Sequence, residues 1–346
     1  METNLIKCAS EYLAVRYVHS ENQQWAEGVR QQPVEHTYST LIDVQTATDV
    51  ERAMTKVIDE TMSDDAGVML SGGIDSAIVA AMLPRGTKAF TIDFVAETAV
   101  RESRLSRTYA EHLGLDLHVV DVDKETFFSH AEALMRHKKS PLHPIEPALY
   151  ELAQQAREMG INKLYTGKGA DTNFGGLDKL MSRDWTFDDF VTRYNFLNPQ
   201  DVLQDGLDVG YLYEPYRDGE NIDFMHFLRD VHGRCSVLVF ENPISLAGVE
   251  MIEPFEHLNL VGGFDFERIR NGEPKYLLVE LFTQLYQTDA PWKVPFSRPT
   301  EEWLQTWEGP AHELFRNDVD YSTFGGDPRF LMWSLNEFLT LLSTWQ

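Results

Sequence analysis

Cysteine is scarce in this sequence, in which only Cys8 and Cys235 occur among 346 residues. Two cysteines cannot build a four-thiolate zinc site or a framework of several disulfides. No run approaches the roughly 18 apolar residues that a membrane-spanning helix needs. The first residues, METNLIKCASEYL, lack the apolar core of a signal peptide. These absences predict a soluble, cytoplasmic protein without a membrane partner.

Basic residues are also few. The chain has 30 Lys and Arg against 55 Asp and Glu, which gives a formal net charge of −25. Nucleic acids and anionic membranes attract basic surfaces, so this balance argues against both as partners. Hydrophobic residues make up 43% of the chain, enough for a large core, and this content argues against disorder.

Helix and strand patterns alternate from about residue 48. Residues 48–65 place Val50, Met54, Val57, Ile58 and Met62 on one helical face. We then expect strands at 66–73, 87–94, 116–123 and 162–171, separated by helices at 76–83, 102–115 and 147–161. Gly114 is placed to end the second of these three helices. The alternation predicts a doubly wound parallel α/β sheet, in which ligands bind beyond the carboxyl ends of the strands.

The other segments are less regular. Residues 177–346 predict aromatic-rich helices that complete the site, without a separate β domain. EYLAVRYV, residues 11–18, fits a helix or a strand. HKKSPLHP, residues 137–144, predicts a loop near the entrance of the site rather than a metal site, because no cysteine or acid accompanies its histidines at ligand spacing.

An apolar run stops abruptly within GVMLSGGIDSAIVAAMLP, residues 67–84. Gly72 and Gly73 let backbone N–H groups approach a ligand, and the helix that begins near Ser76 adds its positive end. Asp75 would repel a bare phosphate but suits a Mg²⁺ ion placed between carboxylate and phosphate oxygens. The P-loop pattern GxxxxGK[ST] is absent. The plainer alternative is a glycine turn with an N-capping serine.

SGGxDS directly after a strand resembles the pyrophosphate loop of the ATP pyrophosphatases, the adenine-nucleotide α-hydrolase type, which cleave ATP between the α and β phosphates. LYTGKGADTNFGG, residues 164–176, resembles the LTGEGADELFGGY segment of asparagine synthetases. GVEMIEPFEHLNLV, residues 248–261, resembles their LEVRVPFLDxxLV, and residues 11–33 and 274–304 are similar to two further segments. The chain therefore resembles the synthetase part of the asparagine synthetase family, with a largely helical C-terminal half.

The resemblance implies a site for ATP and Mg²⁺. The positions that match the pyrophosphate cradle are Ser71, Gly72, Gly73 and Ser76. The positions that would border the adenosine are Leu70, Ile92, Thr166 and Gly167. Asp75 and Asp171 match two Mg²⁺-binding acids. Lys293 matches the lysine that neutralises charge as the α-phosphate bond breaks, and Lys275 matches a second lysine that faces the phosphates.

The chain departs from the family at its beginning. The family's glutaminase domain starts with a catalytic cysteine after the initiator methionine, whereas residue 2 here is Glu. Residues 1–46 resemble the end of that domain, and residues 47–346 the synthetase domain. We therefore expect that the chain alone does not take ammonia from glutamine, and that free ammonia, a separate glutaminase or an amine substrate supplies the nitrogen.

A second departure lies at the second glycine turn, where Lys168 replaces a glutamate of the family's GEGADE and Thr172 an acid. Ile252 and His257 replace Arg and Asp of EVRVPFLD, and KYLLV lacks the arginine of KxxLR. Lys168 is expected to project toward the ligand. It could bind a second substrate carboxylate, act as a base if desolvation lowers its pKa, or simply point to solvent.

These patterns together predict an ATP-dependent amide ligase. A substrate carboxylate would attack the α-phosphorus of Mg·ATP, and ammonia or an amine would then displace AMP from the acyl-adenylate. An ammonia-dependent asparagine synthetase is one alternative. A tRNA- or nucleobase-modifying pyrophosphatase is another, disfavoured by the charge of −25 and the two cysteines. A non-catalytic nucleotide-binding partner subunit is the third, disfavoured by the retained Asp75, Asp171 and Lys293.

Overall fold

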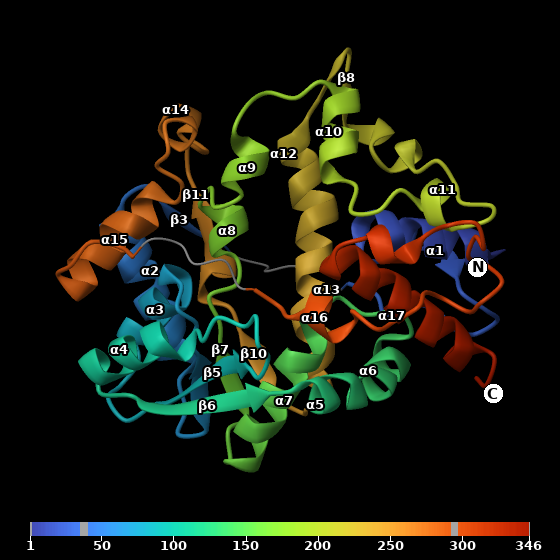
Figure 1. Cartoon of the computed structure of the whole chain (residues 1–346). Helices are drawn as coiled ribbons and strands as arrows, with labels where there is room; N and C mark the ends of the chain where they lie inside the picture. Colours follow the sequence, from blue (N-terminus) through green and yellow to red (C-terminus); the bar gives the residue numbers. More distant parts are fainter. Residues whose placement is uncertain (1, 35–40, 292–296, 346) are drawn as a thin grey trace.

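Five parallel strands form the central sheet of the computed structural model, which describes residues 2–34, 41–291 and 297–345 (Figure 1). In sheet order the strands are β10 (Glu250–Ile252), β7 (Lys163–Tyr165), β4 (Ala66–Met69), β5 (Lys88–Phe94) and β6 (Asp116–Val122). The chain lays down β4, β5 and β6 in order, then returns to the other side of β4 to form β7. The carboxyl ends of β4 and β7 therefore meet where the strand order reverses, which is where open α/β sheets bind ligands.

Helices pack on both faces of this sheet, so the prediction of a doubly wound α/β fold is confirmed. On one face α3 (Ile74–Ala81) and α4 (Ser103–Leu113) contact β4, β5 and β6, with α2 (Ala47–Thr61) and α15 (Tyr276–Tyr286) outside them. On the other face α7 (Glu146–Glu158) and α13 (Gly233–Leu246) contact β5, β6 and β10. Each face has its own buried hydrophobic cluster.

Local signals explain several of these boundaries. The side chain of Thr46 accepts a hydrogen bond from the backbone N–H of Asp49, whose carboxylate accepts one in return, and this capping box starts α2. Val50 and Met54 of the predicted apolar face are fully buried. Gly114 ends α4 in the left-handed conformation, at φ 67°, as predicted.

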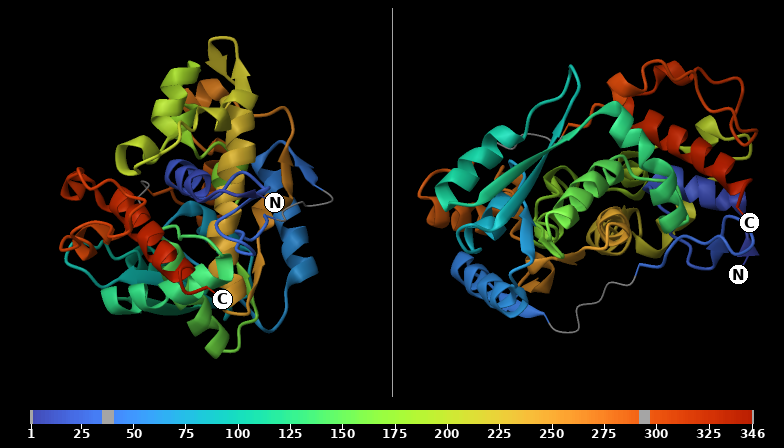
Figure 2. Two further views of the ribbon diagram at one scale, coloured as in Figure 1. Left: turned by 90° about the vertical axis from the view of Figure 1, so that its right-hand side faces the viewer. Right: turned by 90° about the horizontal axis from the view of Figure 1, so that it is seen from below.

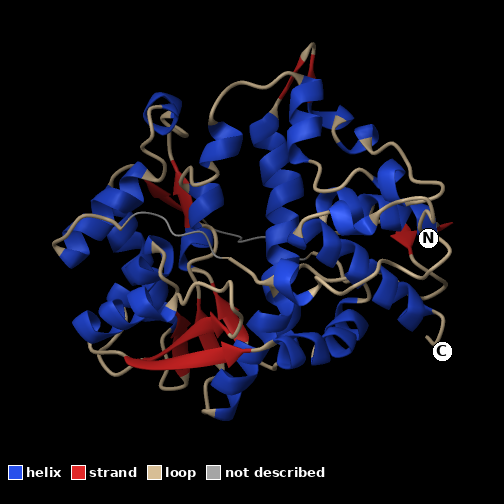
Figure 3. Cartoon of the chain, in the orientation of Figure 1, coloured by secondary structure: helices blue, strands red, loops and turns tan. Residues whose placement is uncertain are grey.

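The C-terminal half is largely helical, as predicted, and its described residues form no separate β domain, but residues 177–346 also contribute short strands at three places. β8 (Arg217–Asp218) and β9 (Asn221–Ile222) form an antiparallel hairpin. β10 joins the edge of the main sheet beside β7, and β11 (Leu258–Leu260) pairs with β3 (Ile42–Val44). Both strands are three residues long, too short to show an alternating pattern, and they form because a neighbouring strand offers free backbone groups. Elsewhere this half is mostly helical (Figure 3).

The N-terminal segment forms a helix where the sequence left helix and strand open. α1 (Leu5–Val15) is buried from Cys8 to Val15 and packs on α11 (Pro199–Val202) and α17 (Gly326–Leu342). It ends at Arg16, which has a left-handed φ of 69°. The two ends of the chain consequently lie on the same side of the molecule (Figure 2).

The remaining elements are short or peripheral. The other helices are α5 (Lys124–Ser129), α6 (Ala131–Lys138), α8 (Ala170–Asn173), α9 (Asp178–Met181), α10 (Phe187–Tyr194), α12 (Phe224–Phe227), α14 (Phe266–Arg270) and α16 (Thr300–Trp303). A π-helical turn, η3 (Leu228–His232), joins α12 to α13, and the 3-10 turns are η1 (Gly210–Leu212), η2 (Glu214–Tyr216), η4 (Pro254–His257) and η5 (Tyr321–Thr323). The other strands are β1 (Glu2–Thr3) and β2 (Gln23–Gln24). None of the helices in the described ranges combines the length and apolar composition needed to cross a bilayer.

Candidate active site

The two glycine turns predicted from the sequence lie against each other at the carboxyl edge of the sheet. One follows β4 and the other follows β7, and these strands are paired neighbours. A Cβ atom on Gly167 would lie 2.8 Å from the backbone nitrogen of Ser76 and 2.9 Å from Cβ of Asp75. Only glycine lets the second turn approach the start of α3 so closely.

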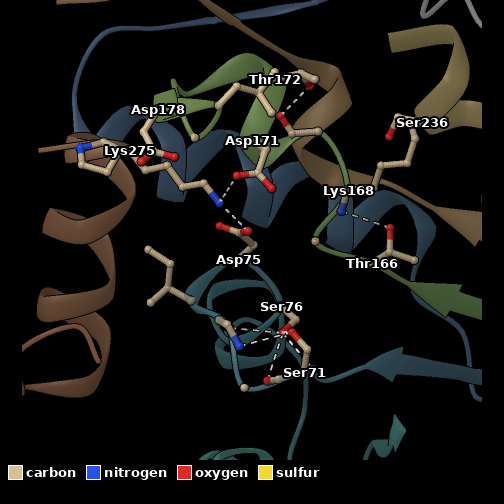
Figure 4. A pocket seen from close by; sticks show the side chains of 18 of the residues that line it. Ser71, Asp75, Ser76, Thr166, Lys168, Asp171, Thr172, Asp178, Ser236 and Lys275 are labelled. Carbon is tan, nitrogen blue, oxygen red and sulfur yellow. Dashed lines mark hydrogen bonds and ion pairs between the residues drawn. The ribbon is translucent and has the colours of Figure 1, made fainter. Parts of the chain in front are cut away.

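Two serines hold the first turn in shape (Figure 4). The backbone N–H of Ser71 donates to Oγ of Ser76 at 3.0 Å, and the two hydroxyls lie 2.9 Å apart. α3 has Gly73 as its N-cap, and no side chain caps it. The alternative of an N-capping serine is therefore wrong, and the first amides of α3 are left for an anion at the helix's positive end.

One lysine joins the two acids that the sequence singles out. Nζ of Lys275 lies 2.6 Å from Oδ2 of Asp75 and 2.8 Å from Oδ1 of Asp171, as Figure 4 shows. Lys275 adopts a left-handed φ of 53°, a conformation that costs a non-glycine residue roughly 1–3 kcal/mol and is concentrated at functional sites. Gly176 admits the lysine, because a Cβ there would lie 2.1 Å from Lys275 Cε.

Lys275 remains charged in this setting. Burial acts to lower the pKa of its ammonium. The carboxylates of Asp75 and Asp171 raise the pKa by more than burial lowers it, so the pKa lies above its usual value. The two acids, which are far apart in sequence, thus converge on a single cation at the edge of the sheet.

This convergence also suits Mg²⁺ with a nucleotide. Mg²⁺ prefers hard oxygen ligands and is commonly held by one or two protein carboxylates together with substrate phosphates. Across residues 2–34, 41–291 and 297–345, no group of three or more His, Cys, Asp or Glu could enclose a metal ion without such help. Asp75 and Asp171 therefore fit a metal that arrives with phosphate oxygens, not a resident metal cage.

A cavity of about 1600 Å³ opens at this edge, larger than the typical range of about 300–1,000 Å³ for a small-ligand pocket. Every candidate site residue in the described ranges lines it: Leu70, Ser71, Gly72, Gly73, Asp75, Ser76, Ile92, Thr166, Gly167, Lys168, Asp171 and Lys275. Lys293 lies outside the described residues. A cavity of this volume has room for a nucleotide and a second substrate.

Lys168 differs from the sequence-based expectation. Although the residue lines the cavity, its ammonium is paired with two carboxylates: Nζ lies 2.7 Å from Oε1 of Glu253 and 2.8 Å from Oε1 of Glu256, and the side chain is only 2% exposed. Burial lowers its pKa, but Glu253 and then Glu256 raise it, with a net upward direction. The interpretations of Lys168 as a solvent-facing lysine or as a base with a lowered pKa are therefore wrong.

The partners of Lys168 carry a signal that sequence reasoning missed. Glu253 and Glu256 occupy positions where the family segment EVRVPFLD has Val and Leu, and Lys168 occupies a position where the family has Glu. The three differences form one buried cluster. Compensating changes at positions in two separate segments could have indicated that the segments touch.

HKKSPLHP is a loop beside the cavity from residue 139 onward, as predicted, although most of that loop is buried. Its first two residues end α6, and the buried Lys138 pairs with Glu146 at 2.6 Å. His143 faces the cavity, with Nε2 lying 3.0 Å from Nη1 of Arg16.

Glu102 is a further residue that sequence reasoning did not identify. It lines the cavity beside the first glycine turn, and burial raises its pKa to about 7, although a hydrogen bond from the backbone of Gly72 opposes the shift. Below that pH the carboxyl is neutral, and above it the carboxyl places a negative charge next to the turn.

The affinity for the non-hydrolysable ATP analogue α,β-methylene-ATP should therefore fall as pH rises through about 7. In Glu102→Gln the side chain at residue 102 is neutral at every pH, so the variant should lack the fall in affinity that ionisation of Glu102 causes. The ratio of the wild-type to the variant dissociation constant should therefore grow with pH. Calorimetric titration of both proteins with the analogue, in the presence of Mg²⁺ and from about pH 6 to about pH 8, measures these dissociation constants. Ionisation of the analogue's phosphates affects both proteins equally, so it cancels in the ratio. A ratio that stays constant over this range contradicts the assignment.

Comparisons with known proteins find similarity over parts of the chain. The sequence model described as asparagine synthase matches residues 49–220, which include both glycine turns. Amidase chry2 of Gibberella zeae and amidase chyE of Penicillium rubens are each 33% identical over 129 residues. Each match covers 32% of this chain, and the chain spans only 19% of the length of either relative.

Among solved structures, a predicted subunit of tRNA methyltransferase from Methanocaldococcus jannaschii is 15% identical. The alignment covers 60% of this chain and 73% of that chain, with a TM-score of 0.21, a value too low to support any inference about this chain.

Proposed function

Because residues 49–220 match the sequence model described as asparagine synthase, we propose that the protein is an ATP-dependent ligase that joins a carboxylic acid to ammonia or an amine through an acyl-adenylate. The observation that carries the proposal is the convergence of Asp75 and Asp171, from two adjoining glycine turns, on the single cation of Lys275. A triphosphate needs such a concentration of metal-binding oxygens and positive charge.

In the first step, a carboxylate oxygen of the acid forms a bond to the α-phosphorus of ATP, and the bond from that phosphorus to the bridging oxygen of the β-phosphate breaks. Pyrophosphate leaves, and negative charge builds up on it as the bond breaks. The amides at the start of α3 and the hydroxyls of Ser71 and Ser76 are placed to bind this leaving group. Mg²⁺ held by Asp75 and Asp171 would neutralise phosphate charge, and Lys275 would then be free to contact phosphate oxygens.

In the second step, the nitrogen of ammonia or an amine forms a bond to the acyl carbon and gives up a proton to solvent. The bond between the acyl carbon and the oxygen of AMP breaks, and AMP leaves with the electron pair of that bond. The walls formed by Leu70, Ile92 and Thr166 are 0%, 7% and 2% exposed and would hold the adenosine. Exclusion of water by such walls protects the acyl-adenylate from hydrolysis. A separate glutaminase is one source of the ammonia.

L-aspartate with ammonia should be a poor substrate pair. Lys168 replaces the glutamate that the asparagine synthetase pattern has beside the reacting carbonyl, and it is paired with Glu253 and Glu256, so this part of the site carries a different set of charges. In a screen of acids and amines read out by pyrophosphate release, we expect aspartate and ammonia to give at most about a tenth of the turnover of the best pair. Efficient asparagine formation would instead identify an ammonia-dependent asparagine synthetase.

A further inference from the structure

The cavity has a second end, formed by residues outside the glycine turns. One wall comes from the start of α7, where Ile145, Leu149 and Leu152 line the cavity at helical spacing. The other wall comes from α13, where Val239 and Phe240 line the cavity. These side chains would surround an apolar body larger than that of aspartate.

The π-helical turn η3 brings polar groups to the same end. His232 closes η3, and Ser236 follows one helical turn later in α13 (Figure 4 labels Ser236), so both line the cavity. π-turns inside helices are frequent at functional sites. The hydroxyl of Tyr194 lies 3.2 Å from Nδ1 of His232.

Arg16 supplies the positive charge at this end. It lines the cavity from the end of α1, and its guanidinium lies over the ring of Phe196 at 3.6 Å from the centroid. Within the described part of the chain, Arg16 has no carboxylate partner, and its buried Nε has no hydrogen-bond acceptor. The nearby cations Lys138 and Arg298 are already paired with Glu146 and Asp327.

The histidines beside Arg16 are neutral. Burial, followed by the charge of Arg16, lowers the pKa of His143 well below its usual value and that of His232 to about 4. Asp171 raises the pKa of His232 in opposition, so His232 lies within electrostatic reach of both Arg16 and Asp171. Arg16 is thus an uncompensated, partly buried cation in a protein with a net charge of −25.

We propose that Arg16 binds a carboxylate on the organic substrate, which carries this group on an apolar body in addition to the reacting acid or amine. The inference rests on the proposed ligase function and specifies its substrate class. The carboxylate could belong to a dicarboxylic acid that is activated or to an amino acid that acts as the amine. Arg16 lies outside the matched residues 49–220, so the family match does not assign it a role.

Two pairs of probes test the proposal by direct calorimetric binding to the full chain loaded with Mg²⁺ and α,β-methylene-ATP. Terephthalate against benzoate tests a second carboxylate on the acid, and L-phenylalanine against phenethylamine tests one on the amine. A hydrogen-bonded ion pair should tighten the binding of one carboxylate-bearing probe by at least about tenfold over its partner. The pair that shows the difference identifies which substrate carries the group.

Arg16→Gln should abolish this difference, Arg16→Lys should retain part of it, and both should bind the ATP analogue normally. Equal binding within both pairs to the wild type would overturn the proposal, whatever the variants do. A difference that survives in Arg16→Gln would overturn it as well. The binding test is independent of turnover. If the protein releases pyrophosphate but binds both members of each probe pair equally, the ligase function stands and the subsite does not. If the protein distinguishes the probes but releases no pyrophosphate, the subsite stands and the ligase function does not.

Discussion

Asp75→Asn and Asp171→Asn should each lower pyrophosphate release by roughly 100- to 1000-fold while the protein stays folded. Each change removes one of the two carboxylates that would hold Mg²⁺ with the triphosphate. Lys275 keeps one carboxylate partner in either single variant, so no buried charge is left unpaired. Circular dichroism tests whether each variant stays folded, and pyrophosphate release at several Mg²⁺ concentrations measures the loss of turnover.

Asp121→Asn is the matched control, because Asp121 is an exposed acid on β6, outside the residues that line the cavity. It should retain wild-type turnover. The double variant Asp75→Asn with Asp171→Asn should be less stable than either single variant, since it leaves the buried ammonium of Lys275 without both partners. Near-normal turnover in either single variant would show that the two acids do not hold the metal.

Lys168→Glu should destabilise the protein by about 3–5 kcal/mol, the usual cost of breaking a buried ion pair. The change would bring a third carboxylate to Glu253 and Glu256 in a place where the side chain at residue 168 is only 2% exposed. The substitution should also lower activity on the natural substrate, because residue 168 belongs to the second glycine turn, and a disturbed turn would displace the other site residues that it carries. Urea unfolding monitored by circular dichroism measures the loss.

Lys179→Glu makes the same charge change at an exposed lysine that also lines the cavity, and it should have little effect on stability. Lys168→Met combined with Glu253→Val and Glu256→Leu should be close to neutral, since a buried ionic cluster can be replaced by apolar groups of similar volume. If Lys168→Glu unfolds at the wild-type urea concentration, the cluster does not hold the second turn in place.

The sequence sufficed for the features that depend on local pattern. The glycine turns, the helix α2 and the four strand patterns between residues 66 and 171 all reflect the conformational preferences of local sequence. From the alternation it also followed that the two turns lie at the carboxyl edge of the sheet, because parallel strands place their ends there.

The partners of the charged side chains could not be predicted in this way. Lys275 reaches Asp75 across 200 residues, and Lys168 reaches Glu256 across 88, so both pairs depend on how distant helices and strands pack. Arg16 faces the cavity only because α1 packs on α11 and α17 and ends at residue 15. β10 was missed because its strand conformation comes from pairing with β7.

Analysis of the products tests the adenylylation proposal most directly. The purified protein is incubated with Mg·ATP and the best acid and amine from the screen, and the phosphorus products are followed by ³¹P NMR with acid labelled with ¹⁸O in its carboxylate. The account predicts AMP and pyrophosphate in equal amounts, with one ¹⁸O atom transferred from the acid to the phosphate of AMP. Formation of ADP and inorganic phosphate, or of AMP without the label, would contradict it.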